Sequence, residues 1–199
     1  MGEAEPGGSE IRYYHGSAIR DGKIYAQNSF RCVEAYYPCA YNLGGADRRW
    51  PGWISVDLKP TADLQADIRQ LPIASETADA VAAIHVLEHF YLWEVADLLR
   101  EWKRILKPGG IMIIEVPCLD KIFAYIAECI QKNDPMHTFV TLNALYGDPK
   151  HRDPLMCHKW GYMIEHLRRL LEFVGMRNIE KKDALYHFKF RDVRFEAIK

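Results

Sequence analysis

The sequence has no long hydrophobic run and no excess of charge of either sign. Its 199 residues include 26 Lys and Arg against 27 Asp and Glu, which gives a formal net charge of −1. It therefore lacks the basic surplus that marks nucleic-acid-binding domains. The longest apolar runs, residues 78–87 and 111–116, are too short to cross a bilayer. We expect neither a nucleic acid nor a membrane as partner, and favour a small molecule.

The cysteines lack any pairing pattern. Five are present, an odd number, and none stands in a C-x-x-C pair: Cys32, Cys39, Cys118, Cys129 and Cys157. Because they lie within or beside apolar runs, we interpret them as reduced thiols that are buried or half-buried. Reduced thiols are typical of the cytoplasm, which is the location we expect. The first residues also lack the apolar core of a signal peptide.

The remaining pattern predicts a short leader and one domain. Residues 1–10 are rich in Gly, Glu and Pro and are expected to be disordered. Residues 11–199 are long enough to bury one sizeable core. Apolar periodicity predicts strands over residues 39–43, 53–57, 62–66, 78–85, 111–116, 176–181 and 187–198, and helices over residues 91–106, 119–131 and 161–173.

Strands that alternate with helices predict an α/β fold with a Rossmann-like, mostly parallel sheet flanked by helices. The last strand alternates apolar and polar residues, so we expect it to be antiparallel at the sheet edge. The first crossover, between residues 43 and 53, is too short for a long helix and is therefore reduced. Residues 133–160 show no regular period, and a long irregular segment in a compact domain is typically functional.

The most informative spacing is a strand, the sequence Asn42-Leu43-Gly44-Gly45, and a second strand that ends in Asp57. In open α/β sheets, ligands bind beyond the carboxyl ends of the strands. Glycine lets the backbone approach a ligand where a Cβ atom would collide with it. An acid at the end of the second strand can accept hydrogen bonds from ribose hydroxyls. These features together indicate a nucleoside site.

The sequence also lacks the fingerprint of a dinucleotide site. A pyrophosphate favours G-x-G-x-x-G at the start of a regular helix, with an acid about twenty residues further on. Here Ala46 replaces the later glycine, residues 48–51 (Arg-Arg-Trp-Pro) follow at once, and Asp57 comes early. A cofactor with an adenosine and an amino-acid tail, but no phosphate, fits this pattern better.

Five motifs in order resemble the small class I S-adenosylmethionine-dependent methyltransferases of the type 11 group. They are Asn42-Leu43-Gly44-Gly45, the stretch from Pro51 to Leu58, Ala66-Asp67-Ile68 with Leu71-Pro72, His85-Val86-Leu87-Glu88-His89, and Leu106-Lys107-Pro108-Gly109-Gly110. Residues 158–175 also resemble the C-terminal helix and glycine of the family. The resemblance implies S-adenosylmethionine as cofactor and in-line methyl transfer to a small-molecule or saccharide acceptor. Residues 133–160 would then form a loop or lid on the acceptor side.

The resemblance also implies which residues bind the cofactor: Asn42, Gly44, Gly45, Asp57, Leu58, Asp67, Ile68, His85, Val86 and Leu87. The backbone of Gly44 and Gly45 would lie under the methionine part, and Asp57 would bind the ribose hydroxyls. Asp67 and the Ile68 backbone would read the adenine edge, and residues 85–87 would flank the sulfonium. The sequence departs from the family at Gly45-Ala46, where the family often has a cysteine, a serine or another small residue followed by glycine.

Two histidines are candidate general bases. A base is needed only if the acceptor is a hydroxyl that must lose its proton, and we favour His89 or His158 because histidine titrates near neutral pH. The sequence His85-x-x-Glu88-His89 also fits the H-x-x-E-H signature of zinc hydrolases. That chemistry requires one helix and a further ligand, whereas His85 ends a predicted strand, so we expect no metal.

The main alternative to an enzyme is a methyltransferase-like binding or scaffold subunit that keeps the cofactor cradle without catalysis. The intact cofactor motifs favour the enzyme. His137, His151, Cys157 and His158 match no common metal-site spacing, and we interpret them as loop residues. Nothing in the residues chooses among oxygen, nitrogen and carbon acceptors.

Overall fold

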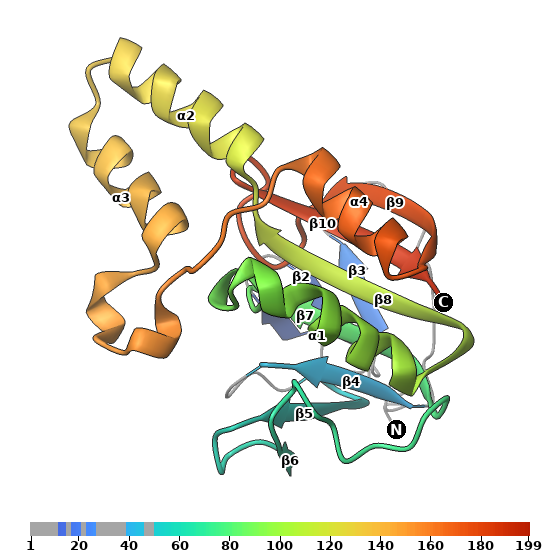
Figure 1. Cartoon of the computed structure of the whole chain (residues 1–199). Helices are drawn as coiled ribbons and strands as arrows, with labels where there is room; N and C mark the ends of the chain where they lie inside the picture. Colours follow the sequence, from blue (N-terminus) through green and yellow to red (C-terminus); the bar gives the residue numbers. More distant parts are fainter. Residues whose placement is uncertain (1–11, 15–16, 21–22, 27–38, 46–49) are drawn as a thin grey trace, which may run out of the picture.

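The computed structural model describes residues 12–14, 17–20, 23–26, 39–45 and 50–199, so the expected leader and Cys32 lie outside the described residues (Figure 1). Near the N-terminus, β1 (Arg12–Tyr14), β2 (Ser17–Arg20) and β3 (Lys23–Ala26) form a small antiparallel sheet. The remaining strands belong to a second, larger sheet, which positions the candidate site.

The larger sheet has seven strands in the order β6-β5-β4-β7-β8-β10-β9. Their bounds are β4 Ala40–Leu43, β5 Trp53–Asp57, β6 Leu64–Gln65, β7 Ala78–Ile84, β8 Leu106–Pro117, β9 Arg177–Asp183 and β10 Asp192–Ile198. The strands from β4 to β8 pair in parallel, and β10 pairs antiparallel with both β8 and β9. This arrangement confirms the predicted Rossmann-like, mostly parallel sheet with an antiparallel C-terminal strand.

The C-terminal strands differ from the prediction in one respect. The last strand, β10, begins at Asp192 and lies between β8 and β9, so β9 occupies the edge. Phe188 and Phe190, which lie within the strand predicted over residues 187–198, are about half exposed, at 54% and 49%. The backbone N–H groups of Arg191 and Asp192 both donate to the carbonyl of Phe188, at 3.0 and 2.8 Å. This turn ends the strand at Asp192, although the alternation of apolar and polar residues continues back to residue 187 in the sequence.

Four helices accompany the sheet: α1 Leu92–Ile105, α2 Leu119–Gln131, α3 Pro135–Tyr146 and α4 Ile164–Phe173. The apolar stripe of α1, which includes Leu99 and Trp102, and the buried residues Leu167 and Leu171 of α4 pack on one face of the sheet (Figure 1). On the other face, Trp50 stacks on Tyr186 at a ring-centroid distance of 4.7 Å. Within the described part of the chain, no helix is both long and apolar enough to cross a membrane.

Residues 133–160 contain a helix that the sequence pattern did not predict. Asp134 caps α3 by accepting a hydrogen bond from the backbone N–H of His137, and Pro135 stands in the first turn. The apolar side chains of α3 do not line one face, which is why no helical period is visible. Two 3₁₀ turns, Pro149–His151 and Pro154–Met156, follow. Together α2 and α3 form a hairpin that extends away from the sheet (Figure 1).

Two smaller expectations concern loops and thiols. Residues 46–49 of the first crossover lie outside the described residues, and residues 44–45 and 50–52 on either side are not helical. The cysteines within the described ranges are free thiols, and Cys118 and Cys129 are buried as predicted. Cys157 is exposed, because it follows a 3₁₀ turn on the surface of the irregular segment.

Glu115 ties the end of β8 to the loop before β10. Its side chain is fully buried, and its carboxylate accepts hydrogen bonds from the backbone N–H groups of Leu185, Tyr186 and His187, at 2.8, 3.1 and 3.0 Å. Burial raises the pKa of Glu115 above its ordinary value, even though these donors favour the charged form. The loop therefore depends on one acid that is distant in sequence.

Replacing Glu115 with alanine leaves three backbone donors without this acceptor. We expect Glu115→Ala to lower the free energy of unfolding by about 2–4 kcal/mol, because unmet buried polar groups are costly. Urea unfolding followed by circular dichroism measures the change. Glu172→Ala, on the exposed side of α4, is the control and should change the free energy by no more than about 0.5 kcal/mol. Equal effects of the two substitutions would contradict this role of Glu115.

Candidate functional site

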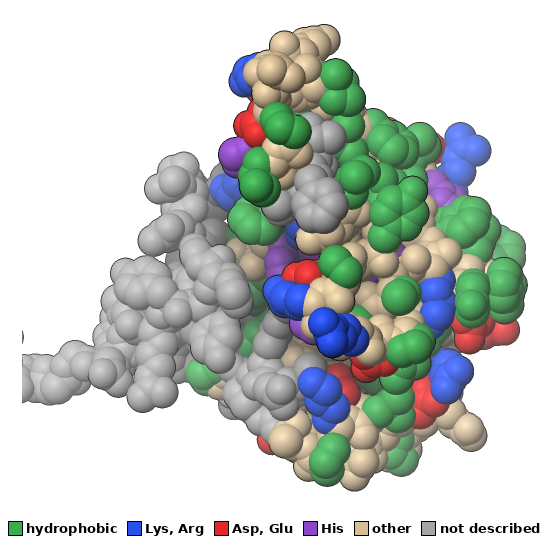
Figure 2. Space-filling model, turned by 90° about the vertical axis from the view of Figure 1, so that its left-hand side faces the viewer, with side chains coloured by type: hydrophobic (Ala, Val, Ile, Leu, Met, Phe, Trp, Pro, Cys, Tyr) green, Lys and Arg blue, Asp and Glu red, His purple; other side chains and the backbone are tan. Residues whose placement is uncertain are grey.

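The predicted cofactor residues follow the carboxyl ends of neighbouring parallel strands. Gly44 follows β4, Asp57 ends β5, and His85 follows β7. Because β4 pairs in parallel with both β5 and β7, these three positions lie along one edge of the sheet. The strands point toward the left in Figure 1, and Figure 2 shows that side, where histidines gather among acidic and basic side chains.

The turn after β4 admits only glycine. Gly44 has a φ of +66°, and a Cβ atom there would lie 2.7 Å from Cγ2 of Val86. A Cβ atom on Gly45 would lie 2.1 Å from Nδ2 of Asn42, a buried side chain. The Gly44 N–H donates to the Val56 carbonyl at 2.8 Å, which fixes the turn against β5. The result is a strand end of bare backbone that a ligand can approach closely.

Asp57 and Leu58 stand beside this turn at the end of β5. Asp57 is half-buried, and its Oδ1 accepts a hydrogen bond from the backbone N–H of Lys59 at 3.0 Å. Its carbonyl accepts from the N–H of Ala66 at 3.0 Å, which holds the segment after β6 close to β5. Leu58 is 56% exposed. The structure thus brings an acid, an exposed apolar side chain and the 66–68 segment together.

Asp67 is paired with a residue that the sequence interpretation missed. The Arg69 guanidinium donates to both of its carboxylate oxygens at 2.7–3.1 Å, and these bonds lower the pKa of Asp67. Its Oδ1 also accepts from the Arg69 N–H at 2.9 Å. Next to it, Ile68 is buried and its carbonyl accepts from the Trp102 indole at 3.0 Å. Any ligand that uses the Asp67 carboxylate must compete with Arg69.

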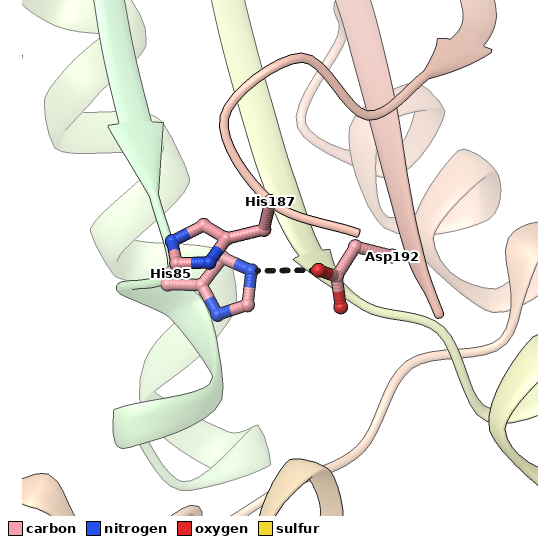
Figure 3. Close-up of side chains that lie close together, drawn as sticks. All are labelled: His85, His187 and Asp192. Atoms are coloured by element: carbon pink, nitrogen blue, oxygen red, sulfur yellow. Dashed lines mark ion pairs between the residues drawn. The ribbon is translucent and has the colours of Figure 1, made fainter. Parts of the chain in front are cut away.

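His85 lies between two buried carboxylates. Its Nδ1 is 3.1 Å from Oε1 of Glu88, and its Nε2 is 3.4 Å from Oδ2 of Asp192 (Figure 3). Its ring also contacts that of His187, at a centroid distance of 3.8 Å and an angle of 39° between the ring planes. Burial opposes the charged ring, but the two carboxylates outweigh it and raise the pKa of His85 to about 9. His85, the residue expected beside the sulfonium, is thus positively charged and paired with Glu88 and Asp192.

The segment after His85 forms a 3₁₀ turn, Leu87–His89, and not an α-helix. Val86 and Leu87 are buried in the core, and Glu88 is buried below the surface at 1% exposure. The H-x-x-E-H residues therefore do not share one helix, so the zinc-hydrolase arrangement does not form. Glu88 is ionised despite its burial, because His85 lowers its pKa.

The structure brings together the two candidate bases, which are distant in sequence. The rings of His89 and His158 are 5.0 Å apart between centroids. Nδ1 of His89 lies 3.2 Å from the Cys157 carbonyl, and Nδ1 of His158 lies 2.9 Å from the Ala144 carbonyl. Burial lowers the pKa of His158 below its ordinary value, so its ring is neutral at neutral pH.

A cavity of about 590 Å³ lies within the segment from α3 to Cys157, the residue that precedes His158. Its lining includes Leu142, Tyr146, Arg152 and Met156. The sequence pattern predicts a functional segment over residues 133–160, but it does not predict helix α3 within it. It did not predict Glu115, His187 or Asp192, because no local motif connects them to the strand ends.

Known proteins resemble the chain in sequence and in fold. Residues 51–114 match the family model described as a methyltransferase domain. A probable S-adenosylmethionine-dependent methyltransferase from Mycolicibacterium smegmatis is 32% identical over 59 residues, which are 29% of this chain and 22% of that protein. The chain thus aligns with about a fifth of the length of the curated relatives it matches.

Solved structures share the fold over most of the chain. A methyltransferase from Archaeoglobus fulgidus has a TM-score of 0.54 at 14% identity, over 81% of this chain and 86% of that one. The 1,6-didemethyltoxoflavin-N1-methyltransferase of Burkholderia thailandensis, solved with S-adenosylhomocysteine, has a TM-score of 0.56 at 11% identity, over 81% and 70%. Residues 51–114 thus resemble a methyltransferase domain, and the chain shares the fold of solved S-adenosylmethionine-dependent methyltransferases.

Proposed function

We propose that this protein is an enzyme that transfers a methyl group from S-adenosylmethionine to a small-molecule or saccharide acceptor. The observation that carries the proposal is the bare turn of Gly44 and Gly45, beside Asp57 and the His85 segment, at one edge of the sheet. The free thiols of the described cysteines agree with a cytoplasmic location.

The residues at this edge fit the proposed cofactor. The backbone of Gly44 and Gly45 would hold the methionine part. A Cβ atom at either position would collide with the chain itself, so both positions leave the backbone uncovered. Asp57, with Asn42 behind the turn and Leu58 beside it, would hold the ribose. Asp67 and the Ile68 backbone would meet the adenine edge, and residues 85–87 would flank the sulfonium. When bound, the cofactor supplies an electrophilic methyl group.

The acceptor would enter from the side of residues 133–160, where the cavity next to Cys157 lies. His89 or His158 would take the proton of a hydroxyl acceptor. The Nδ1 atom of each ring faces a backbone carbonyl, so the neutral ring carries its lone pair on Nε2. The low pKa of His158 favours this neutral form.

Removing the Asp57 carboxylate tests the cofactor site. We expect Asp57→Ala to weaken S-adenosylmethionine binding by about 30-fold or more, because hydrogen bonds from hydroxyls to a charged group contribute about 2 kcal/mol. Isothermal titration calorimetry measures the affinity. Asp97→Ala, an 83% exposed acid on α1, is the matched control and should bind as the unchanged protein does. Full affinity in Asp57→Ala would refute the site.

Release of S-adenosylhomocysteine in the presence of candidate acceptors then tests the reaction. The same protein that binds the cofactor should form this product with at least one acceptor. Cofactor binding without turnover across sugars, hydroxylated metabolites and amines would favour the non-catalytic binding subunit.

Arg69 should oppose adenine binding, because it occupies the Asp67 carboxylate. We expect Arg69→Ala to strengthen S-adenosylmethionine binding by up to about fivefold, the size of an exposed ion pair. Asp67→Ala should weaken it by about tenfold through the lost hydrogen bond. Calorimetry measures both, with Arg100→Ala on α1 as the control for charge. Weaker binding in Arg69→Ala would mean that Arg69 itself contacts the cofactor.

A further inference from the structure

Glu88 is a buried acid whose carboxylate oxygens have no well-aligned hydrogen-bond donor among the described residues. Its side chain is 1% exposed. His85 approaches Oε1 to 3.1 Å, which compensates charge without completing the hydrogen bonds of the carboxylate. Buried carboxylates in proteins are paired, hydrogen-bonded or bound to a metal. One side of Glu88 is therefore open to a further cation.

His89 and His158 also lie close to the Glu88 carboxylate. One ring nitrogen of each and a carboxylate oxygen of Glu88 all lie within 4.8 Å of one another. Because both Nδ1 atoms face backbone carbonyls, at 3.2 and 2.9 Å, the lone pairs are on the Nε2 atoms. A metal-binding histidine typically donates its other ring N–H to a carbonyl or carboxylate, which fixes its tautomer and orientation.

We propose that Glu88, His89 and His158 bind one divalent transition-metal ion of the zinc class. Two imidazole nitrogens and one carboxylate oxygen are the donors that such ions accept, and three protein ligands leave a fourth position open. Metal–nitrogen bonds of about 2.0–2.1 Å require ligand atoms about 3.4 Å apart. Binding would therefore have to draw these atoms together from their present spacing of up to 4.8 Å. Magnesium and calcium prefer oxygen ligands and fit less well.

The neighbouring group of His85, His187 and Asp192 is also close enough to bind a metal, but its acid is already used. The Asp192 carboxylate accepts from the Arg191 guanidinium at 2.7 and 2.9 Å and from the Phe188 N–H at 3.0 Å. A metal there would meet the charge of Arg191. Within the described ranges Glu88 has no such donor, so the structure favours its group. This departs from the expectation of no metal that the sequence pattern gave.

The metal would also have a chemical role, which rests on the proposed methyl transfer. An acceptor hydroxyl in the open position would release its proton to solvent more readily, because a bound metal lowers the pKa of an oxygen ligand. Its oxygen would then bond to the methyl carbon of the cofactor as the bond from that carbon to sulfur breaks, which leaves S-adenosylhomocysteine. With the metal bound, the lone pairs of His89 and His158 belong to it, and neither ring is the base. Metal binding itself requires neither cofactor nor acceptor.

Calorimetric titration of chelator-treated, full-length protein with Zn²⁺ tests the site. We expect one ion per chain, and at least about 100-fold weaker binding in His158→Ala and in Glu88→Gln, each of which removes a ligand. The control is His137→Ala. That histidine is exposed and also contacts a carboxylate, with Nδ1 2.6 Å from Oδ2 of Asp134, but it lies outside the group. It should leave the affinity unchanged.

Titration with Co²⁺ adds a readout of geometry. A site with few ligands gives a stronger visible absorption band than hydrated cobalt, and His158→Ala should remove this band. Circular dichroism checks that each variant folds, and His89→Ala replaces any variant that does not. Absence of zinc binding, or binding unchanged in every ligand variant, would overturn the proposal. The metal titrations contain no S-adenosylmethionine, so a failure to bind metal would not contradict the proposed methyl transfer.

Discussion

The charged contacts of His85 connect the parts of the structure on which the candidate site depends. Its imidazolium lies between Glu88, in the turn after β7, and Asp192, at the start of β10. His85 itself has a φ of +54°, a left-handed conformation that is costly outside glycine. Without this ring, two buried carboxylates would lose a cationic neighbour. The ion pairs therefore hold both the strained turn and the C-terminal strand in place.

Much of the fold follows from patterns that are local in sequence. The apolar run of β7 is buried on both faces of the sheet, and the helical stripe of α1 is buried on one face, as the two patterns predict. The prediction fails where local and tertiary signals separate. Helix α3 shows no amphipathic period, and its start depends on the Asp134 cap. The alternation before β10 stops at a backbone turn that apolar periodicity does not encode.

The candidate site could be predicted in the same partial way. The positions of Gly44 and Asp57 at strand ends can be predicted, because strand ends and glycine turns have local signals. The parallel pairing of β4 and β5 then places both residues along one edge of the sheet. Arg69 was missed although it stands two residues from Asp67, since a salt bridge between near neighbours has no distinctive spacing. Glu115 and Asp192 were missed because their partners lie 70 or more residues away and are brought close only by the order of the sheet.

The H-x-x-E-H sequence predicts the wrong geometry, but it contains two of the proposed metal ligands, Glu88 and His89. On one helix, both histidines of that motif would face a common metal. Here His85 faces Asp192 across the sheet, so it acts as a counter-ion, and His158 from the segment after α3 takes the place beside Glu88 and His89. A buried carboxylate with one cationic neighbour is more costly than one with two. The same acid that stabilises the turn after β7 is therefore the acid best placed to attract a metal.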